Sequence, residues 1–264
     1  MPELTELSGR FDDQGNVELV PVLFLHAYPY QRTMWSPQVQ ALAGEARLLS
    51  LDVRGHTPGA PAPAAYMLEH LVDDALALLD QRGIERCVLC GLSMGGYIAL
   101  RLYQRAPERV RGLLLSNIQA PADSNPSKEA RAAGLRLLWK EGVAAFAEMQ
   151  LKRQLSPTTH ERAPEVVEKL RRMIVALTPE VLSASMVALA TRPDLTELLP
   201  RVSVPTAVVI GEHDPITPPA AARALADGIP GATLQVLPGA GHIANLEAEP
   251  EFTSALRALL ARTR

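Results

Sequence analysis

One stretch of eleven residues, CVLCGLSMGGY at positions 87–97, constrains the fold of this chain more than any other. It predicts a short buried strand over its first four residues, then a sharp turn around Ser93 and the start of an apolar helix. The serine lies within Gly91-x-Ser93-x-Gly95, the pattern of a nucleophile elbow, in which the residues that crowd the turn must be small. Such a turn presents the serine hydroxyl above a sheet edge, at the positive end of a helix.

Similar strands recur along the chain and alternate with amphipathic helices. Apolar strands are predicted at 22–25, 47–55, 87–90, 110–117, 205–211 and 232–238. Helices are predicted at 34–43 and 67–81, after the elbow, up to about residue 226, and from about 250 to 260. Residues 4–20 predict an additional β-hairpin around a turn at 12–16. This alternation is typical of an α/β protein with a mostly parallel central sheet and helices on both faces.

The alternation stops between about Gln119 and Asp194. Helical stretches take its place, predicted at 127–140, 142–153, 163–177 and 179–191. The expected organisation is therefore a core domain of residues 1–118 and 195–264, with a small helical cap, residues 119–194, inserted before the next strand. The apolar residues of the cap predict a mostly hydrophobic, enclosed site beneath it.

Four predicted strands end close to residues capable of acid–base or nucleophilic chemistry: His26, Ser93, Asp214 and His242. The carboxyl ends of parallel strands meet at one edge of an open sheet. A serine hydroxyl needs a base to take its proton, and the imidazole of that base needs a buried carboxylate to fix its tautomer. Ser93, Asp214 and His242 therefore predict a catalytic triad. His26 and His56 are expected to hold loops by hydrogen bonds.

Taken together, these features resemble the α/β-hydrolase superfamily over nearly the whole chain. The segments that carry the resemblance are His26-Ala27-Tyr28-Pro29, Asp52-Val53-Arg54-Gly55-His56, Gly91-Leu92-Ser93-Met94-Gly95-Gly96, Gly211-Glu212-His213-Asp214 and Gly239-Ala240-Gly241-His242. Within the superfamily, the chain is similar to small-capped bacterial esterases and to the 3-oxoadipate enol-lactonase group. The resemblance implies the α/β-hydrolase fold, with Ser93 as nucleophile, His242 as base and Asp214 as orienting acid.

The resemblance also implies an oxyanion hole made by the backbone N–H groups of Tyr28 and Met94. The chain departs from the family pattern at Ala27, where the family commonly has glycine. It departs again in the loop GHTPG, where the family usually shows G-x-G-x-S. The residues expected to line the substrate pocket are Tyr28, Trp139, Phe146 and Ile243.

Three assignments have alternatives. Some relatives take the acid from the end of the preceding strand, so Asp123 competes with Asp214, although the equivalent strand end here is Asn117, which is not a carboxylate. His213 adjoins Asp214 and is an alternative base, but its side chain should point elsewhere at the strand end. Arg192, at the end of the cap, is either a solvated or salt-bridged residue or a clamp for a substrate carboxylate.

Composition argues against several other classes of protein. The net charge of −3 and the pI near 6.1 provide no electrostatic footprint for nucleic acid or an anionic membrane. Neither a signal peptide nor a run of about 18 apolar residues is evident, so a cytoplasmic protein is expected. Cys87 and Cys90 would lie about 10 Å apart on one strand and point to opposite faces, so they are expected to be core residues. No further cysteine or clustered histidine completes a metal site.

The sequence therefore predicts a serine hydrolase that cleaves a small carboxylic ester or lactone through an acyl-enzyme. The expectation includes no metal or organic cofactor, no nucleic-acid or membrane partner, and a monomer or homodimer. One alternative keeps the triad but changes the reaction to that of a C–C bond hydrolase or a cofactor-free perhydrolase. An alternative from another class is a non-catalytic, ligand-binding hydrolase-like protein.

Overall fold

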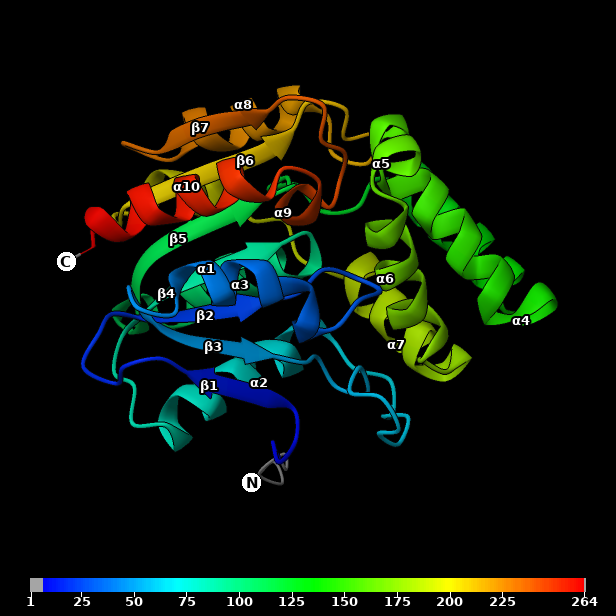
Figure 1. The fold of residues 1–264 in the computed structure, drawn as a ribbon, viewed down its shortest axis with the longest axis horizontal. Helices are drawn as coiled ribbons and strands as arrows, with labels where there is room; N and C mark the ends of the chain where they lie inside the picture. Colours follow the sequence, from blue (N-terminus) through cyan, green and yellow to red (C-terminus); the bar gives the residue numbers. More distant parts are fainter. Residues whose placement is uncertain (1–6, 264) are drawn as a thin grey trace.

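The computed structural model describes residues 7–263. At its centre lies one seven-stranded sheet with the order β1-β3-β2-β4-β5-β6-β7 (Figure 1). The strands are β1 (Phe11–Gln14), β2 (Pro21–Leu25), β3 (Arg47–Leu51), β4 (Cys87–Leu92), β5 (Val110–Ser116), β6 (Thr206–Gly211) and β7 (Thr233–Leu237). β1 pairs antiparallel with β3, and the other pairings in the sheet are parallel. The carboxyl ends of β2 to β7 therefore lie along one edge.

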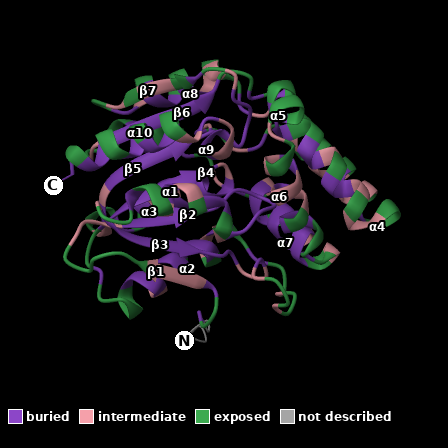
Figure 2. Ribbon diagram, in the orientation of Figure 1, coloured by how far each residue is buried: buried purple, intermediate pink, exposed green. Residues whose placement is uncertain are grey.

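Helices pack on the sheet, and α1 contacts α10 while α2 contacts α3. Their bounds are α1 (Ser36–Leu42), α2 (Leu68–Gln81), α3 (Met94–Arg105), α8 (Pro219–Gly228), α9 (Ala244–Glu247) and α10 (Glu249–Ala261). Short 3-10 helices are η1 (Arg32–Trp35), η2 (Pro107–Arg109) and η3 (Thr196–Arg201). Figure 2 shows the inner strands as one buried layer, and every residue of β4 is buried. Burial on both faces explains why these strands are continuous apolar runs rather than alternating ones.

The β-hairpin expected over residues 4–20 is wrong for the part that the structure describes. β1 pairs with β3, with Phe11 opposite Leu51, and β3 lies between β1 and β2. An ion pair between Arg47 of β3 and Asp13 of β1, 2.7 Å long, helps to hold this pairing. Residues 1–6 lie outside the described residues.

Four helices between β5 and β6 lie together at the carboxyl ends of the strands (Figure 1). They are α4 (Asn125–Gln154), α5 (Pro157–Arg162), α6 (Pro164–Val175) and α7 (Pro179–Ala190), and we call them the helical insertion. The helices expected at 163–177 and 179–191 correspond to α6 and α7, whereas α5 was not expected.

α4 contains a sharp break, so the two helices expected at 127–140 and 142–153 are its two halves. Gly142 at the break has φ 84° and ψ 175°, a left-handed conformation that favours glycine. The halves fold back on each other. Their close packing is visible at Gly134 of the first half, where an added Cβ would lie only 3.6 Å from Met149 and 3.7 Å from Phe146 of the second half. Both halves thereby become neighbouring walls of the same space.

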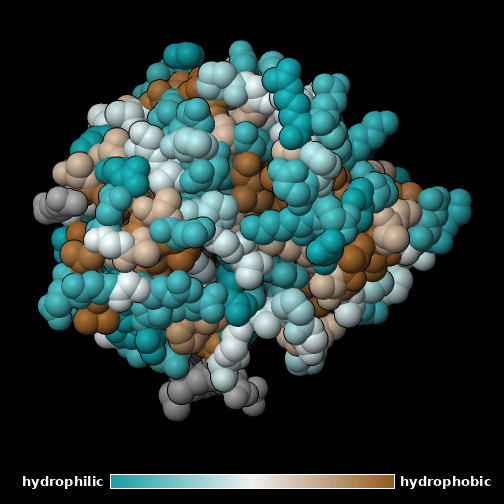
Figure 3. Space-filling view, in the orientation of Figure 1, coloured by the Kyte–Doolittle hydropathy of each residue, from teal (hydrophilic) through white to brown (hydrophobic). Residues whose placement is uncertain are grey.

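The surface in Figure 3 is mostly hydrophilic, with apolar patches that include one over the helical insertion. Exposed large hydrophobic residues of the insertion are Trp139, Val175 and Val187. Between residues 7 and 263 no single helix combines the length and the hydrophobicity needed to cross a membrane. α6 and α7 meet both criteria only as a pair, and they are joined at a bend of 98°.

Candidate active site

Ser93 lies at the turn between β4 and α3. Its φ of 53° and ψ of −115° form a strained conformation for a residue with a side chain. A Cβ on Gly91 would lie 2.3 Å from the carbonyl oxygen of Gly95, and one on Gly95 would lie 1.9 Å from that of Leu25 in β2. Because only glycine fits at both positions, the local sequence holds the serine at the N-terminal end of α3.

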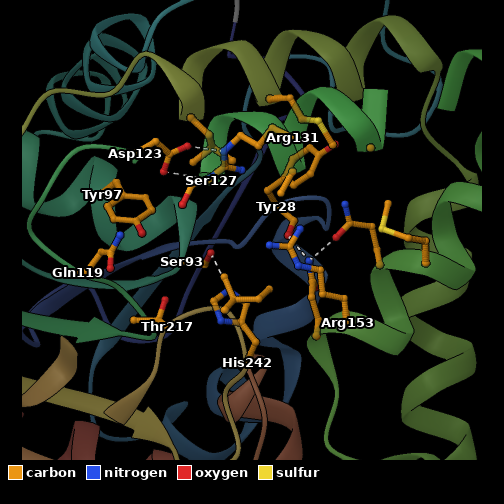
Figure 4. A pocket seen from close by; sticks show the side chains of 18 residues that line it. Tyr28, Ser93, Tyr97, Gln119, Asp123, Ser127, Arg131, Arg153, Thr217 and His242 are labelled. Atoms are coloured by element: carbon orange, nitrogen blue, oxygen red, sulfur yellow. Dashed lines mark hydrogen bonds and ion pairs between the residues drawn. The ribbon is translucent and has the colours of Figure 1, made fainter. Parts of the chain in front are cut away.

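Ser93, His242 and Asp214 meet at the carboxyl edge of the sheet. Nε2 of His242 lies 2.9 Å from Oγ of Ser93, and Nδ1 of His242 lies 2.7 Å from Oδ2 of Asp214. Figure 4 shows Ser93 and His242 pointing toward each other across one wall of a cavity. Asp214 follows β6 and His242 follows β7, so neighbouring parallel strands bring the two together. The three side chains form a hydrogen-bonded chain of hydroxyl, imidazole and carboxylate.

The carboxylate of Asp214 is buried and saturated with donors. Asn117 donates to Oδ2 at 2.8 Å, and the backbone N–H groups of Ile216 and Thr217 donate to Oδ1 at 2.8 and 3.0 Å. Burial by itself would raise the pKa of Asp214, but His242, Asn117 and the Thr217 N–H together hold that pKa below its ordinary value. The carboxyl group is therefore ionised at neutral pH and accepts a hydrogen bond from the Nδ1–H group of His242.

The two competing residues lie elsewhere. The His213 side chain is 53% exposed and lies 3.8 Å from Glu212. Asp123 pairs with two arginines, Arg131 at 2.6 Å and Arg192 at 3.0 Å. Both ring nitrogens of His242 are already bonded, one to Ser93 and the other to Asp214.

The Tyr28 and Met94 amides, expected as oxyanion donors, flank the same region. Met94 is the first residue of α3, and its N–H therefore has no acceptor within the helix. Across the described part of the chain, neither amide donates a hydrogen bond to another protein group. Tyr28 also lines the cavity beside Ser93. Both donors are thus available to a ligand.

Gln154, at the end of α4, connects the insertion to the loop of Tyr28 and Tyr30 and to the loop of His242. Its Nε2 donates to the carbonyl oxygen of Tyr28 at 3.3 Å, and its Oε1 accepts from the Tyr30 hydroxyl at 2.5 Å. Its own carbonyl oxygen accepts from the backbone N–H of His242 at 2.7 Å. The side chain is only 3% exposed. Sequence reasoning missed this residue, because a glutamine in a polar helix carries no signal that separates it from a surface residue.

A cavity of about 90 Å³ opens beside Ser93 and His242, between the sheet edge and the insertion (Figure 4). The expectation of a mostly hydrophobic site is wrong. Apolar side chains such as Met149, Met186, Leu189 and Ile216 line the cavity together with polar ones, among them Gln119, Asp123, Arg131, Gln150 and Arg153. Such a wall can recognise polar as well as apolar groups of a ligand.

Of the four residues expected to line the pocket, only Tyr28 does so. Trp139 is 59% exposed, and its indole N–H donates to Ser183 on the outside of the insertion. It lies near the tip of the α4 fold-back, away from the catalytic serine. Phe146 and Ile243 are fully buried in packing instead, with the Phe146 ring edge-on to that of Tyr28 at 6.4 Å.

His56 and His26 hold loops near the site, as expected. Nδ1 of His56 lies 2.6 Å from the carbonyl oxygen of Tyr30, and its Nε2 lies 2.7 Å from Oγ of Ser185 in α7. Nε2 of His26 accepts from the Val53 N–H at 2.9 Å. Burial lowers the pKa of His56 to about 3 and also lowers that of His26, so both rings are neutral at neutral pH.

The cysteines are free and buried in β4, where burial raises the pKa of Cys87 to about 12. In the stretch from residue 7 to residue 263, no group of three or more histidine, cysteine or acidic side chains is placed to hold a metal ion. The chemistry that this arrangement offers is acid–base and nucleophilic chemistry at a serine oxygen.

Comparisons with known proteins give a consistent result. A family model described as the alpha/beta hydrolase fold matches residues 20–249. The protein 3-oxoadipate enol-lactonase 2 from Acinetobacter baylyi is 30% identical over 94% of this chain and 91% of its own length. Among solved structures, a malate-bound thermophilic esterase from Thermogutta terrifontis is 37% identical with a TM-score of 0.90, over 96% of this chain and 93% of that one. The enol-lactonase from Burkholderia xenovorans LB400 is 32% identical with a TM-score of 0.87, over 95% of each chain.

Proposed function

This chain belongs to the alpha/beta hydrolase family and is a hydrolase of the esterase and enol-lactonase type, and we propose that it cleaves small carboxylic esters or lactones through an acyl-enzyme on Ser93. The observation that carries the proposal is the hydrogen-bonded chain from the Ser93 hydroxyl through His242 to Asp214. The relatives named above are esterases and lactonases, and the small cavity beside the serine suits a small substrate.

In the acylation step, Oγ of Ser93 attacks the carbonyl carbon while Nε2 of His242 takes the hydroxyl proton. The amides of Met94 and Tyr28 stabilise the negative charge that develops on the carbonyl oxygen. His242 then gives its proton to the leaving alkoxide, and the C–O bond of the ester breaks. In a lactone, the alcohol released in this way stays attached to the acyl group.

In the deacylation step, His242 takes a proton from water, and the resulting hydroxide attacks the acyl carbon. Collapse of the second tetrahedral intermediate returns the proton to Oγ of Ser93 and releases the carboxylic acid. Asp214 keeps its charge throughout, because its role is to orient His242 and to stabilise the imidazolium.

The nucleophile is tested with Ser93→Ala. The variant should fold normally and lose about 10⁴-fold or more in kcat on a short ester, the scale of a triad knockout. A fluorophosphonate should label the wild type at one site and leave Ser93→Ala unlabelled, whereas Ser183→Ala, outside the cavity, should label normally. Labelling that persists without Ser93 would move the nucleophile elsewhere.

The same experiment separates the alternatives. A non-catalytic ligand-binding protein would show neither labelling of Ser93 nor acylation by any ester. A C–C bond hydrolase or a perhydrolase would be labelled but would leave simple esters and lactones almost untouched.

A further inference from the structure

The cavity wall holds more positive than negative charge. Asp123 is its one acidic residue within the described chain, and the arginines that line it are Arg131 and Arg153. Asp123 is committed to Arg131, whose Nε lies 2.6 Å from Oδ2, and to Arg192, whose Nη1 lies 3.0 Å from Oδ1. Asp123 acts on Arg153 only from beyond ion-pair distance, so one positive charge of the wall has no directly paired carboxylate among the described residues.

Arg153 is placed to meet a ligand. It follows the fold-back of α4, immediately before Gln154, and in the view of Figure 4 it lies across the cavity from Asp123, with Ser93 between them. Throughout residues 7–263 it makes no ion pair and no side-chain hydrogen bond. Arg153 is an exposed residue. Partial desolvation and the nearby charge of Arg131 lower its pKa, and the charge of Asp123 opposes that shift. A guanidinium nevertheless keeps its proton in proteins, so Arg153 remains charged and is open to direct contact with solvent or a bound anion.

Arg192 cannot take this role, although it is an arginine of the same region. It is 4% exposed, and its guanidinium stacks on the ring of Tyr97 at 4.2 Å. It does not line the cavity. Its nitrogens have no hydrogen-bond acceptor in the described part of the chain, so its contact with Asp123 is electrostatic and poorly aligned. Arg192 therefore holds Asp123 in place, which is the salt-bridged alternative of the sequence analysis rather than the clamp.

We propose that Arg153 binds a second, ionised carboxylate of the substrate, so that the preferred substrates are short esters or lactones of dicarboxylic acids. This inference rests on the proposed function, because it says which residue binds the part of the ester or lactone that does not react. Guanidinium and carboxylate groups match in a planar, two-point geometry, and such charge-assisted hydrogen bonds are stronger than neutral ones.

The contact should act on binding rather than on the chemical step. The carboxylate is remote from the reacting carbonyl carbon, so it interacts with Arg153 equally in the ground state and in the transition state. Uniform binding of this kind lowers KM and leaves kcat nearly constant. The signature of Arg153 is therefore a KM effect that depends on the charge of the substrate.

The test compares two methyl esters with the same chain length. Methyl pentanoate ends in a methyl group, and monomethyl glutarate ends in a carboxylate. Wild type should prefer the glutarate ester, and Arg153→Gln should reduce the ratio of the two kcat/KM values by about ten- to a hundredfold, the scale of a charged hydrogen bond. Arg153→Lys should retain part of the preference. Lys152→Gln, which removes an exposed positive charge one residue away, is the matched control and should leave the ratio as in wild type.

A binding measurement keeps this inference separate from the proposed function. Calorimetry with glutarate on Ser93→Ala should detect binding that is lost when Arg153→Gln is added. Equal glutarate binding with and without Arg153, or an unchanged ester ratio in Arg153→Gln, would overturn the anion site. Failure of the wild type to cleave either ester would instead overturn the proposed function, even if glutarate binding still depended on Arg153.

Discussion

At the scale of single residues, the proposed catalytic acid, Asp214, depends on a neighbour that is not itself an acid. Asn117 directly follows β5 and donates to Oδ2 of Asp214, while the N–H groups of Ile216 and Thr217 donate to Oδ1 of the same carboxylate. Asn117 has a φ of 55°, a left-handed conformation that asparagine tolerates better than most residues. Its amide leaves Asp214 a single way to point, toward His242.

Replacing the acids one at a time tests this assignment. Asp214→Asn should lose roughly 10³- to 10⁴-fold in kcat near neutral pH, because an amide lets the imidazole adopt the wrong tautomer. Asp123→Asn should keep most of its kcat, because Asp123 contacts arginines and not His242. Steady-state kinetics on one short ester ranks the two variants, and a larger loss in Asp123→Asn would refute the assignment of Asp214.

The three side chains that meet at the candidate site could be predicted from sequence, whereas several of the residues that surround them could not. Ser93, Asp214 and His242 are chemically distinctive types at strand ends, and parallel topology brings strand ends together. Gln154 and Arg153 are ordinary polar residues in a helix. Their place beside the serine follows from the fold-back at Gly142, which composition does not reveal.

At the scale of elements, α4 does two things at once. Its two halves wall the cavity, and its last turn is attached to the loop of Tyr28 and Tyr30 and to the loop of His242. The two halves of α4 were expected as separate helices from hydrophobic periodicity. The expected wall residue Trp139 lies outside, because the break in α4 determines which side of each half faces inward.

Gln154→Met, similar in size but without hydrogen-bonding groups, tests this attachment. Without the bonds to the Tyr28 carbonyl and the Tyr30 hydroxyl, the loop that carries an oxyanion donor should shift, and displacements of about 1 Å can cost 10²-fold in rate. We expect kcat to fall about ten- to a hundredfold with little change in KM. Affinity for an alkyl boronic acid, which mimics the tetrahedral intermediate, should fall in parallel.

Gln150→Met is the matched control for this prediction. Gln150 also lines the cavity, but its side chain bonds to Gln154 and to neither loop. It should therefore lower kcat less than Gln154→Met does. Equal losses in the two variants, or a change confined to KM, would mean that Gln154 contributes to substrate contact rather than to positioning.

At the scale of the whole molecule, the fold was the most predictable property. Continuous apolar strands alternating with helices determine a parallel sheet, and the α/β-hydrolase fold expected from the sequence is confirmed by the family match and the solved relatives. The one topological error is β1, which pairs with β3 instead of forming a hairpin. Weak alternation near a turn does not say which strand will be the partner.

Stability of the whole molecule should depend on pH through its buried histidines. Burial lowers the pKa of His56 from 6.5 to about 3 and lowers that of His26 as well. Below about pH 6.5 the unfolded chain binds protons that the folded chain does not, so the free energy of unfolding should fall on acidification. Each such histidine contributes up to about 1.4 kcal/mol per pH unit until its folded-state pKa is reached.

Urea denaturation at a series of pH values measures this dependence. His56→Gln, which removes one titrating ring and keeps polar atoms for Tyr30 and Ser185, should give a shallower slope between about pH 6.5 and 4. A wild-type slope no steeper than that of His56→Gln would show that His56 is protonated in the folded state.

The break at Gly142 also bears on how chains of this kind diverge. Because α4 doubles back, Arg131 and Arg153 of this one helix line the same cavity, while the proposed catalytic groups come from strand ends far apart in the chain. Selection for a new substrate can therefore work on a single helix and leave the reaction chemistry untouched. Gln154 should limit that freedom, because this residue of the same helix is bonded to the loop of Tyr28 and Tyr30 and its replacement is expected to lower kcat.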